Sequence, residues 1–215
     1  MMEILYEDKC IIVCVKPPGL SSESGMPEAL KELPGTDGVY CVHRLDTGVG
    51  GVMVYAKTGA AAARLSGCIS TGGFVKEYLA VVSGRPVEPR GLMHDLLFKD
   101  QAKNKSYVVK RMRRGVREAE LEYETLETGP DTALLRLRLH TGRSHQIRVQ
   151  LASRAMPILG DMKYGGVRGG GIALFACRLC FPHPESGEAL RFSALPPDAA
   201  PWDRYTYVKE ARKNV

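Results

Sequence analysis

A short charged segment that precedes an apolar run most restricts how this chain can fold. Residues 41–46, Cys-Val-His-Arg-Leu-Asp, lead through Thr47–Gly51 into the apolar run Val52–Ala56. Between buried strands a carboxylate such as Asp46 loses hydration and needs a cation or hydrogen-bond donors, and Arg44 is the nearest candidate. An ionised carboxylate in a partly dry site suits nucleophilic or base chemistry, whereas a lone Asp before a glycine more often caps a turn. The segment alone leaves both interpretations open.

Alternating apolar and polar residues predict a mostly antiparallel sheet. Small or apolar residues alternate with glutamates in 118–125, and residues 132–140 alternate in the same way. Further strands are expected at 4–8 and 10–16, which would form a hairpin, and at 74–82, 107–112, 172–181 and 189–192. Helices are expected at 58–67 with Thr58 as N-cap, at 146–153 with Ser144 as N-cap, and at 201–212, with residues 21–38 mostly loop. These elements indicate an α+β fold, in which short helices flank a mixed, mostly antiparallel sheet.

Length and composition indicate one globular domain. The chain has 215 residues, of which 44% are hydrophobic and 25% charged, with a formal net charge of +6. We find no repeat, no bilayer-spanning apolar run and no signal-peptide pattern, so we expect a single cytoplasmic domain (1–215) without a separate N-terminal RNA-binding module. The positive charge permits a polyanionic partner without proving one. We expect a monomer, although the sequence leaves the oligomeric state open.

The six cysteines predict structural thiols rather than a metal or redox site. Cys177 and Cys180 have the spacing of a zinc knuckle, but no second Cys or His pair accompanies them. Positions three apart in a strand point to opposite faces, so their sulfurs would diverge. We therefore expect reduced thiols in the cytosol, and neither a metal nor a cofactor.

The most basic part of the chain is residues 99–117, which we call the basic segment. Residues 107–112 and 118–125 are expected to form two strands joined around Arg113-Arg114-Gly115. The tip of such a hairpin can bind phosphates, but charge runs are usually solvated faces, and the glutamates of 118–124 can neutralise the neighbouring strand. The candidate phosphate contacts are Lys103, Lys105, Arg111, Arg113 and Arg114.

Several ordered motifs together resemble the RluA-type family of RNA pseudouridine synthases. His43-Arg44-Leu45-Asp46 resembles the first motif of the active site, Lys76-Glu77-Tyr78 the second and the run Gly142–Arg148 the third. Lys16-Pro17-Pro18-Gly19, Gly160-Asp161, Tyr164-Gly165 and the segment Phe181–Pro184 resemble further landmarks, in the same order. The resemblance runs from about Ile4 to Pro197. Each motif is weak by itself, but their order and spacing make the set specific.

The resemblance implies an enzyme that isomerises uridine in ribosomal or transfer RNA, on the pseudouridine synthase fold with a central catalytic cleft. The carried-over residues are Asp46 as nucleophile, Tyr78 as the ring stacked on uracil, and Arg143 as the ion-pair partner of Asp46. Arg44, His43 and Arg148 are expected to contact the RNA. Because the reaction neither oxidises nor hydrolyses, no cofactor or metal is required. The target base must be unpaired or extruded to be reached.

One departure and one rival function qualify this prediction. Where the family usually has Thr-Ser-Gly, this chain has Val49-Gly50-Gly51, so two hydroxyl groups are missing from the loop. The rival is a non-catalytic RNA-binding protein on the same fold. Retention of Asp46 argues against the rival, because a carboxylate that faces RNA phosphates is repulsive unless it has a chemical task.

Overall fold

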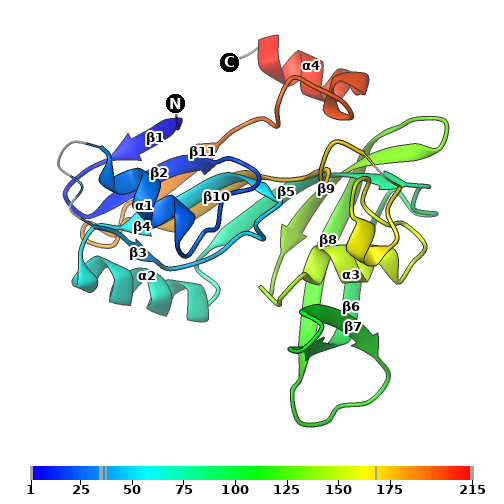
Figure 1. The fold of residues 1–215 in the computed structure, drawn as a ribbon, viewed down its shortest axis with the longest axis horizontal. Coiled ribbons are helices and arrows are strands. Elements are labelled where there is room, and N and C mark those ends of the chain that lie inside the picture. The colour runs from blue at the N-terminus through cyan, green and yellow to red at the C-terminus, as the bar shows by residue number, and fades with distance from the viewer. Residues whose placement is uncertain (1, 34–35, 37, 168, 214–215) are drawn as a thin grey trace. The chain divides into compact units, whose positions relative to one another are not determined.

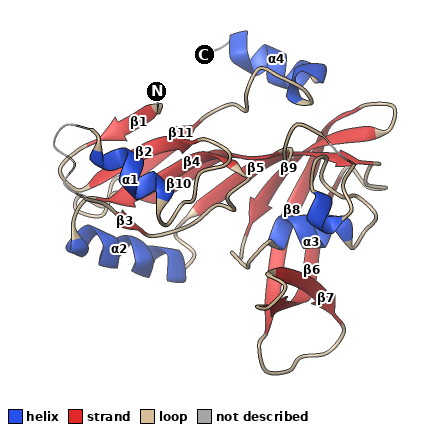
Figure 2. Ribbon diagram, viewed as in Figure 1, coloured by secondary structure: helices blue, strands red, loops and turns tan. Residues whose placement is uncertain are grey.

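The computed structural model describes residues 2–33, 36, 38–167 and 169–213, and divides into two compact units. Unit 1 comprises Met1–Lys76 and Phe175–Pro196, and unit 2 comprises Glu77–Leu174 and Pro197–Val215. Each unit contains strands flanked by helices (Figures 1 and 2), which confirms the α+β class with a mixed sheet. In the part of the chain that is described, no helix has both the length and the apolar character needed to cross a bilayer.

Strand β4 (Gly50–Ala56) is the centre of unit 1. It pairs antiparallel with β2 (Ile11–Lys16), and β2 pairs with β1 (Ile4–Glu7), so the predicted N-terminal hairpin is confirmed. The remaining pairings are antiparallel with β3 (Tyr40–Cys41) and parallel with β10 (Leu174–Pro182), which pairs in turn with β11 (Ala189–Ser193). All seven residues of β4 are buried, as expected for a strand covered on both faces.

Helix α2 (Gly59–Ser70) covers one face of β4. Its buried Ala61 and Leu65 pack in one cluster with Val52 and Val54. The predicted N-cap is confirmed, because the Thr58 hydroxyl accepts a hydrogen bond from Ala61 N–H at 3.1 Å. The predicted end near Gly67 is wrong, since the helix continues past this glycine, which costs only about 1 kcal/mol relative to alanine.

Within residues 21–38, which were expected to be mostly loop, the structure forms helix α1 (Gly25–Lys31), which the sequence did not predict. Met26 and Leu30 lie four positions apart and are fully buried, so burial of one apolar stripe holds this short helix in place. Pro27 falls in the first turn, where a missing N–H costs no helical hydrogen bond. The abundance of Ser, Pro and Gly concealed this pattern from the sequence.

Unit 2 is built on strands β5, β9, β8, β6 and β7, in that order, and the pairs β9–β8, β8–β6 and β6–β7 are antiparallel. Their bounds are Val75–Ser83, Thr132–Leu139, Val116–Thr128, Arg90–Asp100 and Lys105–Val109. Strand β6 was not expected from the sequence, and it separates β7 from β8: Phe98 lies opposite both Tyr107 and Val116. The predicted hairpin between residues 107–112 and 118–125 is therefore wrong, because both strands pair with β6 instead of with each other.

Two helices of unit 2 also differ from the prediction. The N-cap of α3 (Gln146–Ala152) is His145, not Ser144, and His145 has a left-handed backbone (φ 53°) without a side-chain cap. The predicted single helix at 201–212 is a short 3-10 turn, η2 (Trp202–Arg204), followed by α4 (Thr206–Lys213). Trp202 and Tyr205 are buried, and the Tyr205 hydroxyl donates to Thr132 Oγ1 at 2.8 Å, which fixes this turn against unit 2.

We expect Gly51→Ala to lower the free energy of unfolding by more than about 2 kcal/mol, from backbone strain and overpacking. Gly51 has φ +130°, and a Cβ there would lie 2.3 Å from the backbone oxygen of Ala176, on the strand that β4 pairs with. Urea denaturation measures the change. Gly67→Ala is the matched control, because a Cβ at this helical position meets no atom within 4 Å and alanine gains about 0.5–1 kcal/mol in a helix. Equal stabilities of both variants would contradict the expectation.

Candidate active site

Asp46 lies half-buried in the loop between β3 and β4 of unit 1, and buried groups fix the backbone on both sides of it. On the N-terminal side, the Ser22 hydroxyl accepts from Leu45 N–H at 3.1 Å and donates to Leu45 C=O at 2.9 Å. Ser22 is only 3% exposed, and its own carbonyl accepts from the Tyr55 hydroxyl at 3.0 Å. This serine therefore holds both polar backbone groups of the residue before Asp46.

On the C-terminal side, Lys16 and Gly19 hold the carbonyl of Thr47. Lys16 Nζ donates to Thr47 O at 3.2 Å and to Pro17 O and Leu20 O at 2.9 and 2.8 Å. Gly19 N–H donates to the same Thr47 oxygen at 2.7 Å. Burial lowers the pKa of Lys16 to about 8, and the negative charge of Asp46 opposes that shift, so the ammonium stays charged at neutral pH. A cation thus lies under the loop that carries Asp46.

His43 is a structural part of the same loop. Its Nε2 accepts from Val54 N–H at 3.1 Å, and its ring meets Phe74 edge-on with centroids 6.0 Å apart. Burial, reinforced by the charge of Lys76, lowers the pKa of His43 to about 3. The imidazole is therefore neutral and offers no positive charge to a phosphate. Contact between His43 and RNA stays a prediction, with the side chain serving first to fix the loop on β4.

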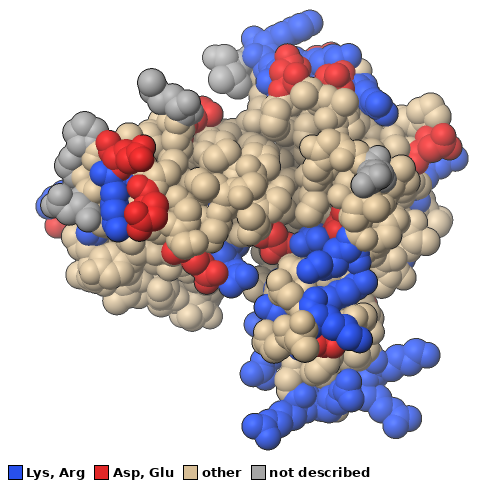
Figure 3. Space-filling view, viewed as in Figure 1, with Lys and Arg blue, Asp and Glu red and all other residues tan. Residues whose placement is uncertain are grey.

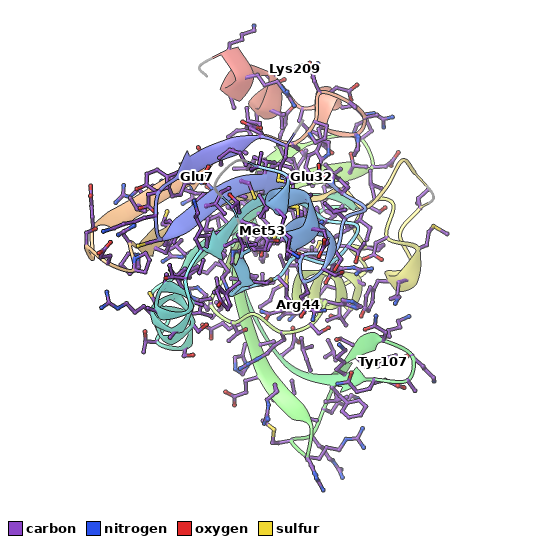
Figure 4. The ribbon with its side chains drawn as sticks, turned by 60° about the vertical axis from the view of Figure 1, so that its left-hand side comes forward. Glu7, Glu32, Arg44, Met53, Tyr107 and Lys209 are labelled. Carbon is purple, nitrogen blue, oxygen red and sulfur yellow. The ribbon has the colours of Figure 1, made fainter. Side chains whose placement is uncertain are left out.

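Arg44 is exposed on this loop and is labelled in Figure 4. Its guanidinium NH1 donates to both carboxylate oxygens of Glu23, at 3.2 and 3.1 Å. The sequence offered Arg44 as the nearest counter-ion for Asp46, but the carboxylate that it binds is Glu23.

In unit 2, Tyr78 lies on β5 and is only 7% exposed. The whole run Tyr78–Val82 is buried, on both faces of the strand. Its role as the ring stacked on uracil stays a prediction.

The buried cation of the third motif is Arg148 rather than Arg143. Arg148 Nε and NH2 donate to the two carboxylate oxygens of Asp161 at 2.7 and 2.8 Å, and both side chains are buried. Tyr164 lies over the guanidinium at 5.2 Å, and its hydroxyl lies 2.9 Å from His145 Nδ1. Because the same hydroxyl accepts from Ser106 N–H at 2.7 Å, it is free to donate to the histidine. His145 thus braces the corner at the start of α3.

Arg143 is exposed. The partner of a partly dehydrated carboxylate would instead be expected to be shielded from water itself. Its Nε donates to the carbonyl of Glu118 at 2.8 Å, while its backbone N–H donates to Gln146 Oε1 at 2.9 Å. The pairing of Arg143 with Asp46 stays a prediction. In the sequence, Gly160-Asp161 stands out only as a landmark of the family. The signal that could have identified Asp161 as the partner of Arg148 is that a buried arginine needs a buried carboxylate.

Basic side chains gather at the far end of β6 and β7, as Figure 3 shows. Lys103, Arg111, Arg113 and Arg114 are exposed, and among the described residues none of the four makes an ion pair. Two glutamates of β8 have partners other than these four cations: Glu124 pairs with Arg90 and Arg136, and Glu122 lies 3.0 Å from His140 Nε2. Lys105 is only partly exposed, and its ammonium lies 5.1 Å from the centre of the Tyr164 ring; the guanidinium of Arg113 lies 5.0 Å from the centre of the Phe98 ring.

The residues most like a metal site are Asp8, Cys10 and His183 of unit 1, whose ligand atoms lie within 4.8 Å of one another. His183 Nδ1 accepts from the backbone N–H groups of Glu185 and Ser186, at 3.3 and 3.1 Å. The ring proton is therefore on Nε2, which donates to Asp8 Oδ2 at 2.8 Å. A metal on Nε2 would need that lone pair, so the cluster suits a tether between two turns better than a cation site.

Comparison with known proteins gives a consistent result. Residues 10–153 match the family model described as RNA pseudouridylate synthase. The dual-specificity RNA pseudouridine synthase RluA of Escherichia coli is 35% identical over 89% of this chain and 91% of its own length. The ribosomal large subunit pseudouridine synthase D of Vibrio cholerae is 34% identical over 92% of this chain and 68% of its own. A solved structure, human RNA pseudouridylate synthase domain containing 4, has a TM-score of 0.77 at 27% identity, covering 91% of this chain and 88% of its own.

We expect Arg148→Met to lower the free energy of unfolding by about 3–5 kcal/mol, because it leaves the buried Asp161 carboxylate without its cation. Arg143→Met, the matched control, removes an exposed side chain with one hydrogen bond to a carbonyl and should cost less than about 1.5 kcal/mol. Urea denaturation of both variants measures the difference. A larger loss for Arg143→Met would reverse the assignment of the structural cation.

Proposed function

Because this chain belongs to the RluA-type family of RNA pseudouridine synthases, which makes it an isomerase that acts on RNA, we propose that Asp46 is its nucleophile and that its substrate is a uridine in structured ribosomal or transfer RNA. The relatives named above support the substrate class, since one is a ribosomal large subunit enzyme and another has dual specificity.

The observation that carries the proposal is the fixed backbone on each side of Asp46. Ser22 binds the backbone of Leu45, and Lys16 and Gly19 bind the carbonyl of Thr47. The loop that carries the Asp46 carboxylate is therefore ordered before the substrate binds. Preorganised placement of a reacting group supplies a large share of catalysis, because less freedom is lost on reaching the transition state. The loop keeps this bracing although Val49-Gly50 replaces two hydroxyl residues, since none of these contacts uses a side chain at position 49 or 50.

The reaction consists of one bond exchange. The glycosidic bond between uracil N1 and the ribose breaks, the base turns, uracil C5 bonds to the same ribose carbon, and the C5 proton leaves while N1 gains a proton. Asp46 acts either by attacking the sugar or by removing one of its protons, and an ionised carboxylate is required for both. The proposal therefore needs neither an oxidant nor a hydrolytic water.

Unit 2 is proposed to supply the other groups. Tyr78 would stack on uracil, an interaction worth about 1–3 kcal/mol per base. The family motif proposes Arg143 as the partner of Asp46. Burial and a fixed orientation instead favour Arg148 as the arginine of this motif that takes part in the reaction. Activity of the two Met variants at a temperature where both are folded distinguishes these assignments.

We expect Asp46→Asn to abolish tritium release from RNA labelled at uracil C5, because the amide keeps the shape of the carboxylate but removes its charge and nucleophilicity. Asp131→Asn is the control: it makes the same chemical change on an exposed loop. An Asp46→Asn protein that turns over within a few-fold of the parent would overturn the mechanism. A parent that binds RNA but releases no tritium would instead favour the rival, a non-catalytic RNA-binding protein.

The exposed cations of the basic segment are proposed to bind RNA phosphates. Replacing Arg113 and Arg114 by Ala should then reduce the slope of log affinity against log salt by roughly 0.7–0.9 per lost contact. The affinity for all RNAs should fall to a similar extent, because phosphate contacts do not read the sequence. Lys209→Ala with Lys213→Ala is the equal-charge control on α4, where Figure 4 labels Lys209. If both double variants change the slope equally, the effect is one of net charge alone, and the basic segment is a solvated face.

A further inference from the structure

The exposed pair of Arg44 and Glu23 brings a carboxylate onto the cation beside Asp46. Both oxygens of Glu23 lie within 3.2 Å of Arg44 NH1, and the two side chains are 62% and 58% exposed. A guanidinium binds the oxygens of carboxylates and of phosphates in the same geometry. Glu23 therefore occupies the kind of position on Arg44 that a phosphate of RNA would take.

The backbone places these two side chains together. Ser22 is bound to Leu45 by two hydrogen bonds, so the residues that adjoin them, Glu23 and Arg44, are adjacent before their side chains meet. The Glu23 N–H also donates to Ser21 Oγ at 3.3 Å, which orders the turn before α1. Most exposed pairs are weak because two long side chains must be ordered, and here part of that ordering is done by the backbone.

The pair is nevertheless weak enough to exchange. It lies in solvent, where screening keeps the net contribution of an ion pair small, and neither side chain is trapped by burial. A phosphate carries a full charge and several acceptor oxygens, so it can replace the carboxylate without leaving Arg44 unpaired. The displaced Glu23 moves into water at little cost, because more than half of it is already exposed.

We propose that Glu23 is a built-in competitor for RNA at Arg44: it holds the guanidinium in the free enzyme and is displaced by a phosphate of the substrate. This inference rests on the proposed function as an RNA-modifying enzyme and on the contact between Arg44 and RNA that the family resemblance implies. Its consequence is a lower affinity for any RNA that does not present a phosphate at this point. Such competition disfavours loose binding on the loop of Asp46 more than binding of a well-placed substrate.

The test is a set of binding measurements with a fluorescein-labelled RNA hairpin that has uridines in its loop. The variants are Glu23→Gln, Arg44→Ala and the double variant, and the dissociation constants are measured by fluorescence anisotropy at low and high salt. Glu28→Gln is the matched control, because Glu28 lies in the same short segment but pairs with Lys31 at 3.0 Å. It removes the same charge without touching Arg44.

We expect Glu23→Gln to tighten binding by about two- to fivefold beyond the effect of Glu28→Gln, the range that an exposed ion pair contributes. The gain should disappear in the Arg44→Ala background and shrink at high salt. An equal gain from both Glu→Gln variants, or a gain that survives Arg44→Ala, would overturn the proposal in favour of a long-range charge effect.

Two other outcomes also overturn it. If Glu23→Gln weakens binding, Glu23 positions Arg44 for RNA rather than competing with RNA. If Arg44→Ala leaves the affinity unchanged, Arg44 meets no phosphate and there is nothing to compete for. Tritium release by the parent protein reports separately on the proposed isomerisation, so failure of the competitor and failure of the enzymatic function are told apart.

Discussion

The hydrogen bonds that hold the backbone around Asp46 are the interaction on which the candidate site of unit 1 depends. A loop that leaves a fully buried strand must find partners for polar groups that water reaches poorly. Here Ser22 and Lys16, from elsewhere in the unit, bind backbone groups of the loop, and His43 of the loop itself accepts from Val54 N–H of β4. Each of the three has further partners of its own, so the loop is held by a network rather than by one contact.

Lys16 shows how this network combines structure with electrostatics. An ammonium has three donors, and the three carbonyls around it match them, which compensates much of the cost of burying the charge. The charge remains and lies close enough to Asp46 to raise its own pKa against the effect of burial. The same side chain thus fixes the loop and brings a positive charge close to Asp46.

In unit 2 an ion pair compensates a buried charge and fixes its orientation. Asp161 fixes the guanidinium of Arg148 in two hydrogen bonds, while Tyr164 covers its face and braces His145 at the left-handed entrance to α3. A buried pair of this kind adds little to stability compared with apolar residues, but it orients the arginine strictly. That orientation, rather than stability, is the physical reason for the proposal that Arg148 takes part in the reaction.

The sequence predicted most strands because their signal is local: residues two apart share a face, and turns have characteristic residues. It also predicted the family, since the order of motifs from Lys16 to Pro184 is visible without any coordinates. Helix α1 escaped prediction because its apolar stripe consists of just two residues, Met26 and Leu30, within a segment rich in Ser, Pro and Gly. Strand β6 escaped because its polar and apolar residues alternate poorly.

Only the tertiary structure decided which strands and which charged side chains, far apart in the chain, pair with each other. The sequence could not show that β7 and β8 both pair with β6, because strand pairing depends on which edges meet and not on the composition of each strand. Nor could it show that Arg44 binds Glu23, or that Arg148 rather than Arg143 is buried on a carboxylate. The sequence by itself thus determined the residue types of the chemistry, whereas their counter-ions are set by contacts between segments far apart in the chain.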